Sequence, residues 1–134
     1  MKRFLAPLVL ALGLTTAQTA PTAPAAPLLG TQWELWLIGT KTVTAERKPT
    51  LSFAEGRAGG YLGCNTGGGA YTLSKTSLQF GPLVSTMMAC EPALMRLEQD
   101  FAAALRATLR YSLSPDGQTL RLVGTGKVLT FKRL

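Results

Sequence analysis

The chain has 134 residues, of which 46% are hydrophobic and 16% charged, and a formal net charge of +7. After removal of an N-terminal leader, this length is enough for one domain with one core and excludes two. Histidine is absent from the sequence, which excludes His-based triads, imidazole metal ligands and the usual general base near neutral pH.

The N-terminal residues are predicted to be a secretory leader followed by a spacer. Lys2 and Arg3 precede the apolar stretch 4–14, and Thr15-Thr16-Ala17 supplies small residues for cleavage. We expect a signal peptide over 1–17, an Ala/Pro/Thr-rich linker over 18–27 and a domain over 28–134. The apolar run is too short to span a bilayer, and no cysteine follows the cut for lipid attachment. The mature protein is therefore expected to be soluble and periplasmic or secreted, with a net charge lowered from +7 to +5 by the loss of Lys2 and Arg3.

The first strand of the domain is predicted over Thr31–Ile38. Strict alternation places Trp33, Leu35 and Leu37 on one face and Trp36 and Ile38 on the other. Both faces are then apolar, which favours core positions for both tryptophans rather than a ligand platform. Glu34 is sent to the outer, solvated face, and residues 39–48 are predicted to be a polar loop.

Alternating apolar residues and turn signals predict further short antiparallel strands. Together with the first, the predicted strands are 31–38, 49–53, 57–62, 70–74, 77–80, 109–113, 119–123 and 128–131. In the last three, the residues expected to face the core are Leu109, Tyr111, Leu113, Leu120, Leu122, Leu129 and Phe131. Arg110, Arg121 and Lys132 are expected to line the opposite face.

The segment Gly59–Cys90 is the most distinctive part of the sequence and contains both cysteines. Gly63 and the run 67–69 flank Cys64 and Asn65, and this density of residues free to adopt positive φ predicts a tightly folded turn between two strands, where larger side chains would not fit. A phosphate-binding loop is rejected because the segment lacks G-K-[ST] and joins strand to strand rather than strand to helix.

One helix is predicted, opened by Glu91-Pro92 with proline in its first turn. Leu94, Leu97, Phe101, Leu105 and Thr108 share one face at helical spacing, and Arg96, Gln99, Asp100 and Arg106 share the other. The fold class is therefore α+β and mainly antiparallel β: a small, partly closed β-barrel or curled sheet, with the single α-helix filling one end or gap.

The two cysteines of an exported chain are expected to form a disulfide, Cys64–Cys90. The alternative is a soft-metal site, in which Met87, Met88 and the two thiolates hold an ion such as Cu(I). Because a disulfide would consume both thiolates, we expect neither a metal nor a cofactor.

Several of these residues together resemble one family. They are the opening strand with Trp33, the block G-C-N-x-x-x-G-x-Y at 63–71, the block S-T-x-M-x-C at 85–90, the helix that follows, and L-x-F at 129–131. The pattern is similar to the META domain, or HslJ-like, family. The matching positions of the two blocks are Gly63, Cys64, Asn65, Gly69, Tyr71, Ser85, Thr86, Met88 and Cys90. Met87 departs from the pattern, since the family often has a polar or basic residue there.

The resemblance implies a compact antiparallel β structure with one helix and functions in stress response, motility or the cell envelope. It carries over no catalytic or binding residues. The primary hypothesis is an exported, non-catalytic envelope module, monomeric, that contributes to stress tolerance through contacts with an unknown protein or envelope component. The alternative is a carrier that holds an apolar ligand or lipid tail between sheet and helix.

An enzyme is not expected, because it would need Ser85 or Thr86 activated without histidine, with Lys75 the only lysine close in sequence. The carboxylates are scattered, without the pairing that a glycosidase or calcium loop needs. Arg110, Arg121 and Lys132 could contact an anionic surface, or form an ordinary solvated face. Nucleic acid is excluded as a partner because the protein is exported and no aromatic residues interleave with these charges.

Overall fold

The structure is a computed structural model that describes Pro7, residues 9–15 and residues 27–134. Pro7 and residues 9–15 form neither helix nor strand and are exposed. The predicted cleavage point at Ala17 and most of the predicted linker lie outside the described residues. Leu28 is fully buried, so the core begins at this residue.

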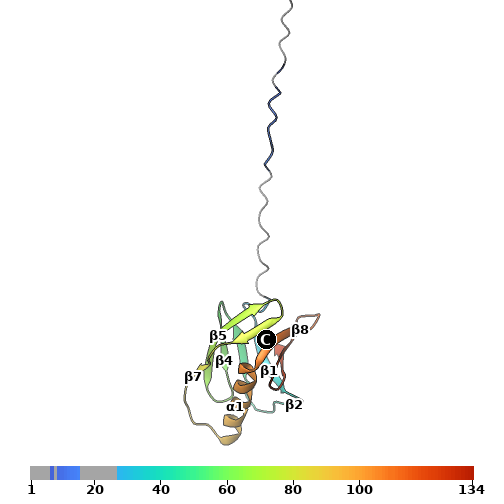
Figure 1. Cartoon of the computed structure of the whole chain (residues 1–134). Coiled ribbons are helices and arrows are strands. Elements are labelled where there is room, and N and C mark those ends of the chain that lie inside the picture. The colour runs from blue at the N-terminus through green and yellow to red at the C-terminus, as the bar shows by residue number, and fades with distance from the viewer. Residues whose placement is uncertain (1–6, 8, 16–26) are drawn as a thin grey trace, which may run out of the picture.

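The domain has ten strands and one helix, and Figure 1 shows how they are arranged. Their bounds are β1 Gln32–Ile38, β2 Lys41–Thr42, β3 Thr50–Phe53, β4 Arg57–Tyr61, β5 Thr66–Ser74, β6 Ser77–Phe80, β7 Val84–Ser85, α1 Pro92–Arg106, β8 Thr108–Leu113, β9 Thr119–Gly124 and β10 Leu129–Arg133. All strand pairings are antiparallel. This is the α+β class predicted from the sequence.

Eight of the strands form a closed barrel. The order β10-β9-β8-β6-β5-β4-β3-β1 returns on itself because β1 also pairs with β10, so the barrel is closed rather than partly closed. The shortest strand pairing in the barrel is between β6 and β8, where Ser77 opposite Arg110 is the one residue pair in register. Beside it, Tyr111 N donates a hydrogen bond to Thr76 O at 3.0 Å. The two short strands lie outside the ring: β7 pairs with β5, and β2 pairs with β1 within the segment predicted to be a polar loop.

Large apolar side chains occupy the core. Those that are fully buried are Trp33, Phe53, Phe101, Phe131, Leu28, Leu35, Leu51, Leu78, Leu105, Leu120, Leu122 and Leu129. The ring of Phe101 on α1 lies 6.0 Å from that of Phe131 on β10, which packs the helix against the sheet. The indole N–H of Trp33 donates to Thr31 Oγ1 at 2.7 Å, so this buried polar group is satisfied.

Because of two β-bulges, some side chains face the other way from the predicted pattern. In β1, Leu35 lies opposite Phe131 and Leu37 opposite Thr130, so Trp36 is an extra residue. A bulge of this kind shifts the alternation by one residue. Ile38 therefore enters the core, whereas Trp36 and Leu37 are only partly buried, the reverse of the assignment predicted for Leu37 and Ile38.

The second bulge lies at the start of β8. Thr108 pairs with Gly124 and Arg110 with Val123, so Leu109 has no opposite residue. Leu109 is accordingly 43% exposed, and its predicted core position is wrong. Tyr111 follows the bulge and is buried as predicted.

Helix α1 begins where the sequence predicted, with Glu91 at the N-cap and proline in the first turn. Phe101, Ala104 and Leu105 are buried, whereas Leu94 and Leu97 are half-buried. The helix ends at Arg106, so Thr108, predicted on its apolar face, belongs to β8 instead. Its hydroxyl donates to Ala104 O at 2.9 Å and joins the helix end to that strand.

The glycine run 67–69 is part of strand β5, not of a turn. These glycines lie opposite Gly60, Gly59 and Ala58 of β4, and of the glycines in the described segment 59–69 only Gly63 has a positive φ. The predicted turn is therefore wrong for this run, but the lack of side chains does allow close packing. A Cβ at residue 67 would lie 2.6 Å from Val84 O, and one at residue 69 would lie 2.5 Å from Pro82 O.

Candidate functional site

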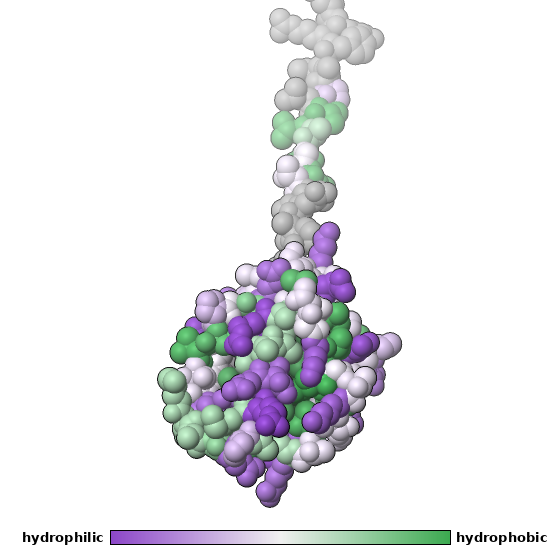
Figure 2. Space-filling model, turned by 60° about the horizontal axis from the view of Figure 1, so that its bottom comes forward, coloured by the Kyte–Doolittle hydropathy of each residue, from purple (hydrophilic) through white to green (hydrophobic). Residues whose placement is uncertain are grey.

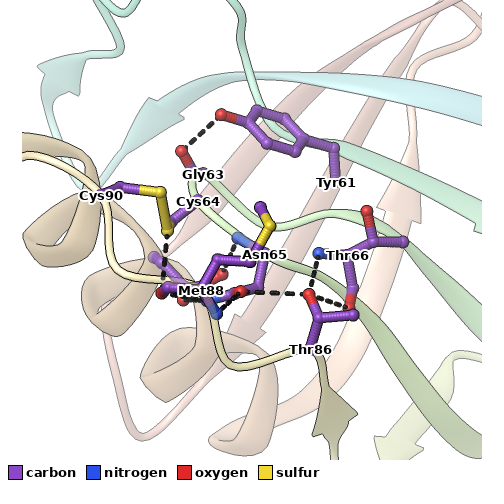
Figure 3. Close-up of a disulfide and its surroundings, with 9 residues drawn as sticks. Tyr61, Gly63, Cys64, Asn65, Thr66, Thr86, Met88 and Cys90 are labelled. Atoms are coloured by element: carbon purple, nitrogen blue, oxygen red, sulfur yellow. Dashed lines mark hydrogen bonds between the residues drawn. A yellow bond between two sulfur atoms is a disulfide. The ribbon is translucent and has the colours of Figure 1, made fainter.

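The two sequence blocks meet where helix α1 passes the β4–β5 connection (Figure 3). Asn65 lies at the centre of this point and is 6% exposed. We call the group the Asn65 clasp and define it by the residues Cys64, Asn65, Thr86, Met88, Cys90 and Glu98. Five of these six residues were singled out in the sequence; Glu98 was not.

The side-chain amide of Asn65 holds the β7–α1 segment. Its Oδ1 accepts hydrogen bonds from Met88 N at 2.6 Å and from Thr86 Oγ1 at 3.0 Å. Thr86 Oγ1 in turn accepts from Thr66 N at 3.3 Å. The Nδ2 atom of Asn65 lies 3.5 Å from Met88 O. Both ends of the amide are therefore engaged, which explains why asparagine, with one acceptor and one donor end, stands here.

Glu98 holds the same residue from the helix. One carboxylate oxygen accepts from Asn65 N at 2.7 Å, and the other accepts from Asn65 Nδ2 at 2.8 Å. Charge-assisted bonds of this kind are stronger than neutral ones. The sequence signal for this role is weak: Glu98 is a carboxylate beside the half-buried Leu97, at the edge of the apolar face of the helix.

A disulfide joins Cys64 to Cys90, as predicted; the two positions are 26 apart in sequence and their Cα atoms are 5.9 Å apart. Cys64 Sγ also lies 3.5 Å from Met88 O, a contact without a hydrogen bond because a disulfide sulfur carries no hydrogen to donate. The bond consumes both thiols that the Cu(I) alternative required. The disulfide and the Asn65 amide thus bind the same two segments together.

Gly63 lets the helix approach the β4–β5 connection. Its φ is +126°, and a Cβ there would lie 3.1 Å from Glu98 N and 3.3 Å from Glu98 Cα. The Gly63 carbonyl accepts a hydrogen bond from the Tyr61 hydroxyl at 2.5 Å. Arg47 lies over the Tyr61 ring, with 3.8 Å between Cζ and the centroid.

Tyr71 and Ser85 belong to the sequence blocks but lie outside the clasp. The Tyr71 hydroxyl donates to Ala54 O at 2.8 Å, and its ring meets Phe53 edge-on at 5.3 Å. Desolvation by burial, and then the negative charge of Glu55, raise the pKa of Tyr71. Ser85 lies opposite Gly67 in the β5–β7 pair and is exposed.

The residues of the enzyme alternative do not converge. Lys75 lies in the turn after β5, whereas Ser85 pairs with Gly67 near the start of that strand. Gly67 and the last residue of β5, Ser74, are seven residue steps apart, or about 23 Å along the strand. Thr86 uses its hydroxyl within the clasp. Among the described residues, no group of three or more His, Cys, Asp or Glu side chains is placed to hold a metal ion.

Four exposed apolar side chains lie on β7, on the segment after it and on the first turn of α1. Val84, Met87, Met88 and, on the helix, Met95 are exposed, and Met87 reaches 97%. Figure 2 shows a pale green area at the lower left, the side on which this segment runs in Figure 1. We call these four residues the methionine surface. An exposed apolar group of this kind is typical of protein contact sites.

Two adjoining hollows lie between α1 and residues 38–47. The first has a volume of about 290 Å³. It is lined by the apolar residues Ile38, Val43, Ala45, Leu94 and Leu97 and by the charged residues Lys41, Glu91, Arg96, Asp100 and Lys127. The second, of about 530 Å³, includes Arg47 and Tyr61. Trp33 lines neither of them, so neither is the interior of the barrel.

The family model for the META domain matches residues 26–134, which is most of the chain and contains the whole clasp. The chain belongs to the META-domain family. The clasp shows what the two META-domain sequence blocks do in this member: they fasten the helix and the preceding segment to the barrel. No curated protein matches the chain.

Two solved structures share this META-domain fold. One is described as the NMR structure of the protein from Burkholderia xenovorans; it is 29% identical over 88% of this chain and 96% of its own, with a TM-score of 0.67. A second NMR structure is 27% identical over 81% of this chain and 94% of its own, with a TM-score of 0.66. Within the described residues, no helix is both long and apolar enough to cross a membrane.

Proposed function

We propose that this META-domain protein is an exported, non-catalytic module of the cell envelope, periplasmic or secreted, that contributes to stress tolerance through contacts with a protein or envelope component. The observation that carries the proposal is the Asn65 clasp. The polar groups of its two blocks bind one another and so are not arranged around a substrate. The disulfide supports an oxidising compartment.

The exposed surfaces support action through contacts. The methionine surface offers apolar area to a protein, and the exposed Arg110, Arg121 and Lys132 offer positive charge to an anionic component. The absence of catalysis is supported by the lack of histidine in the sequence and by the separation of Ser85 from Lys75. We propose that the protein acts as a monomer.

Export is tested by fractionating cells that produce the full chain and sequencing the N-terminus of the envelope form. We expect a mature chain that begins after Ala17. A mature chain that retains residues 4–14 would show that this stretch is an anchor and would overturn the export part of the proposal.

The contact is tested with a photo-reactive amino acid in place of Met87, compared with the same amino acid in place of the exposed Gln79 on β6. We expect cross-linked envelope products from position 87 and none from position 79. A strain that lacks the protein should be more sensitive to envelope stress and should be restored by the full chain. Equal or absent cross-linking at both positions, with no stress phenotype, would refute the proposal.

A second candidate function, the binding of an apolar ligand, is favoured by the 290 Å³ hollow beside α1. Its volume lies at the lower end of the range for small-molecule sites. Native mass spectrometry of protein purified from its own envelope separates the two functions. A co-purified lipid would support the carrier, and a co-purified protein would support the contact module.

A further inference from the structure

Three cationic side chains form an oblique line on the outside of the barrel. Arg121 on β9 lies opposite Ser112, two residues from Arg110 on β8. It also lies opposite Thr130, two residues from Lys132 on β10. Diagonal neighbours in a sheet are about 7–8 Å apart. The register therefore places one positive charge on each of three successive strands, and all three side chains are exposed.

The line ends at an aromatic ring with a second lysine. Lys132 Nζ lies 3.6 Å from the centroid of the Trp36 ring on β1, and Lys48 Nζ lies 4.9 Å from the same centroid. The negative face of an indole attracts each ammonium group, but the two groups repel each other. An anion bound beside these two groups would relieve this repulsion. Alternation from the buried Trp33 and Leu35 places this ring on the outer face of β1.

This face has little negative charge of its own. Glu34, opposite Lys132, is the one acidic residue in the described strands β1, β8, β9 and β10, against the four cations of the line and its end. The remaining acidic residues of the domain lie on α1 and in turns or loops. We call Arg110, Arg121, Lys132, Lys48 and Trp36 the cationic line.

We infer that the cationic line binds a linear acidic polysaccharide that carries carboxylate groups. This inference rests on the proposed envelope function and names the chemistry of one partner. The line is one charge wide and crosses the convex outside of a barrel, a shape that a flexible polymer can follow and a flat bilayer touches only in part. A carboxylate at the end of the line would contact Lys132, and a sugar ring would cover exposed parts of Trp36.

The test is titration of the exported full chain with polygalacturonate at about 50 mM salt, read by the fluorescence of Trp36 and by calorimetry. The triple variant Arg110→Gln, Arg121→Gln, Lys132→Gln is compared with a control triple variant. The control, Lys41→Gln, Arg57→Gln, Arg106→Gln, removes the same charge from exposed positions elsewhere.

We expect the line variant to bind at least about tenfold more weakly and the control less than about threefold. A plot of the logarithm of the binding constant against the logarithm of the salt concentration gives a negative slope. The magnitude of this slope should be smaller by about two to three in the line variant, because binding releases fewer counterions. Trp36→Phe should remove the fluorescence change, since Trp33 is fully buried.

Equal losses in the two triple variants would show attraction to net charge alone and would overturn the inference. Binding to phosphatidylglycerol vesicles without binding to polygalacturonate would replace the polymer with a bilayer. No binding to either would also overturn it. In each case, cross-linking at position 87 in the line variant shows whether the envelope contact itself remains.

Discussion

At Asn65, a single side chain connects three segments that are distant in sequence. Its amide and backbone N–H bind Thr86 and Met88 on one side and Glu98 on the other. The residue is almost fully buried, so its loss would leave several partners without a hydrogen bond. Leaving buried polar groups unpaired costs more than the net gain of forming the bonds.

Asn65→Ala is therefore expected to lower the free energy of unfolding by about 2–4 kcal/mol. Gln79→Ala, at an exposed strand position, should lower it by less than about 0.5 kcal/mol. Urea denaturation measures both. The double variant with Glu98→Ala should cost less than the sum of the two single variants, because each of them removes the bond between Asn65 Nδ2 and the Glu98 carboxylate; additive losses would contradict the clasp.

Gly63→Ala tests the approach of the helix. Gly63 and Gly30 both have positive φ, but a Cβ at residue 30 would meet nothing within 4 Å, whereas one at residue 63 would meet the Glu98 backbone at 3.1 Å. We expect a loss of about 1–2 kcal/mol for Gly30→Ala from backbone strain and about 2–4 kcal/mol for Gly63→Ala. Similar losses in denaturation would show that the helix yields easily.

At the scale of the element, α1 is fastened at two levels. Its middle is held by apolar packing, with Phe101 against Phe131. The residue before its N-cap is held by the disulfide at Cys90, and its second turn is held by the bonds of Glu98 to Asn65. Proline at the start costs no hydrogen bond, and Arg106 in the last turn complements the negative end of the helix dipole.

Phe101→Ala is expected to cost about 3–5 kcal/mol, because it removes a fully buried ring and leaves a cavity. Gln99→Ala, on the exposed side of the same helix, should cost less than about 0.5 kcal/mol. Chemical denaturation of the two variants gives the comparison. Small losses at both positions would place the helix outside the core.

Removal of the disulfide by Cys64→Ala and Cys90→Ala should lower the free energy of unfolding by about 3–4 kcal/mol, since the bond closes a loop of 26 residues in the unfolded chain. This is a large part of the roughly 5–15 kcal/mol typical of a small domain. A thiol count on unfolded, unreduced protein should find none. Two free thiols would refute the disulfide and restore the Cu(I) alternative.

At the scale of the whole molecule, a closed barrel with large buried side chains leaves the interior filled. Trp33 is fully buried in it, and neither hollow beside α1 is lined by that residue. An apolar ligand, if one binds, would therefore lie outside the barrel, in the hollow between α1 and residues 38–47.

Trp36→Phe leaves Trp33 as the one tryptophan, since the chain has two. We expect no saturable quenching of Trp33 fluorescence by a fatty acid or an apolar dye, because a filled core admits neither. Saturable quenching in this variant would show a ligand cavity inside the barrel. The protein without the substitution serves as the reference for surface effects at Trp36.

Much of this fold could be predicted from local patterns. The strands β3, β6 and β9, the start of α1 at Pro92 and the core positions Phe101 and Phe131 follow from two-residue and helical periodicity and from the fixed φ of proline. The pairing of Cys64 with Cys90 could be predicted because the chain has two cysteines and was predicted to be exported. The META-domain blocks pointed to the clasp, but not to what its residues do.

The sequence by itself determined the class of the fold, the single helix and the family, because those depend on patterns between near neighbours. Tertiary structure decided the rest. The bulges at Trp36 and Leu109 depend on the partner strands that oppose them. The run Gly67–Gly69 has no side chains to alternate, so its place in β5 is set by its neighbours β4 and β7. The bond of Glu98 to Asn65 and the closure of β1 on β10 join residues far apart in the chain, and only the folded molecule brings them together.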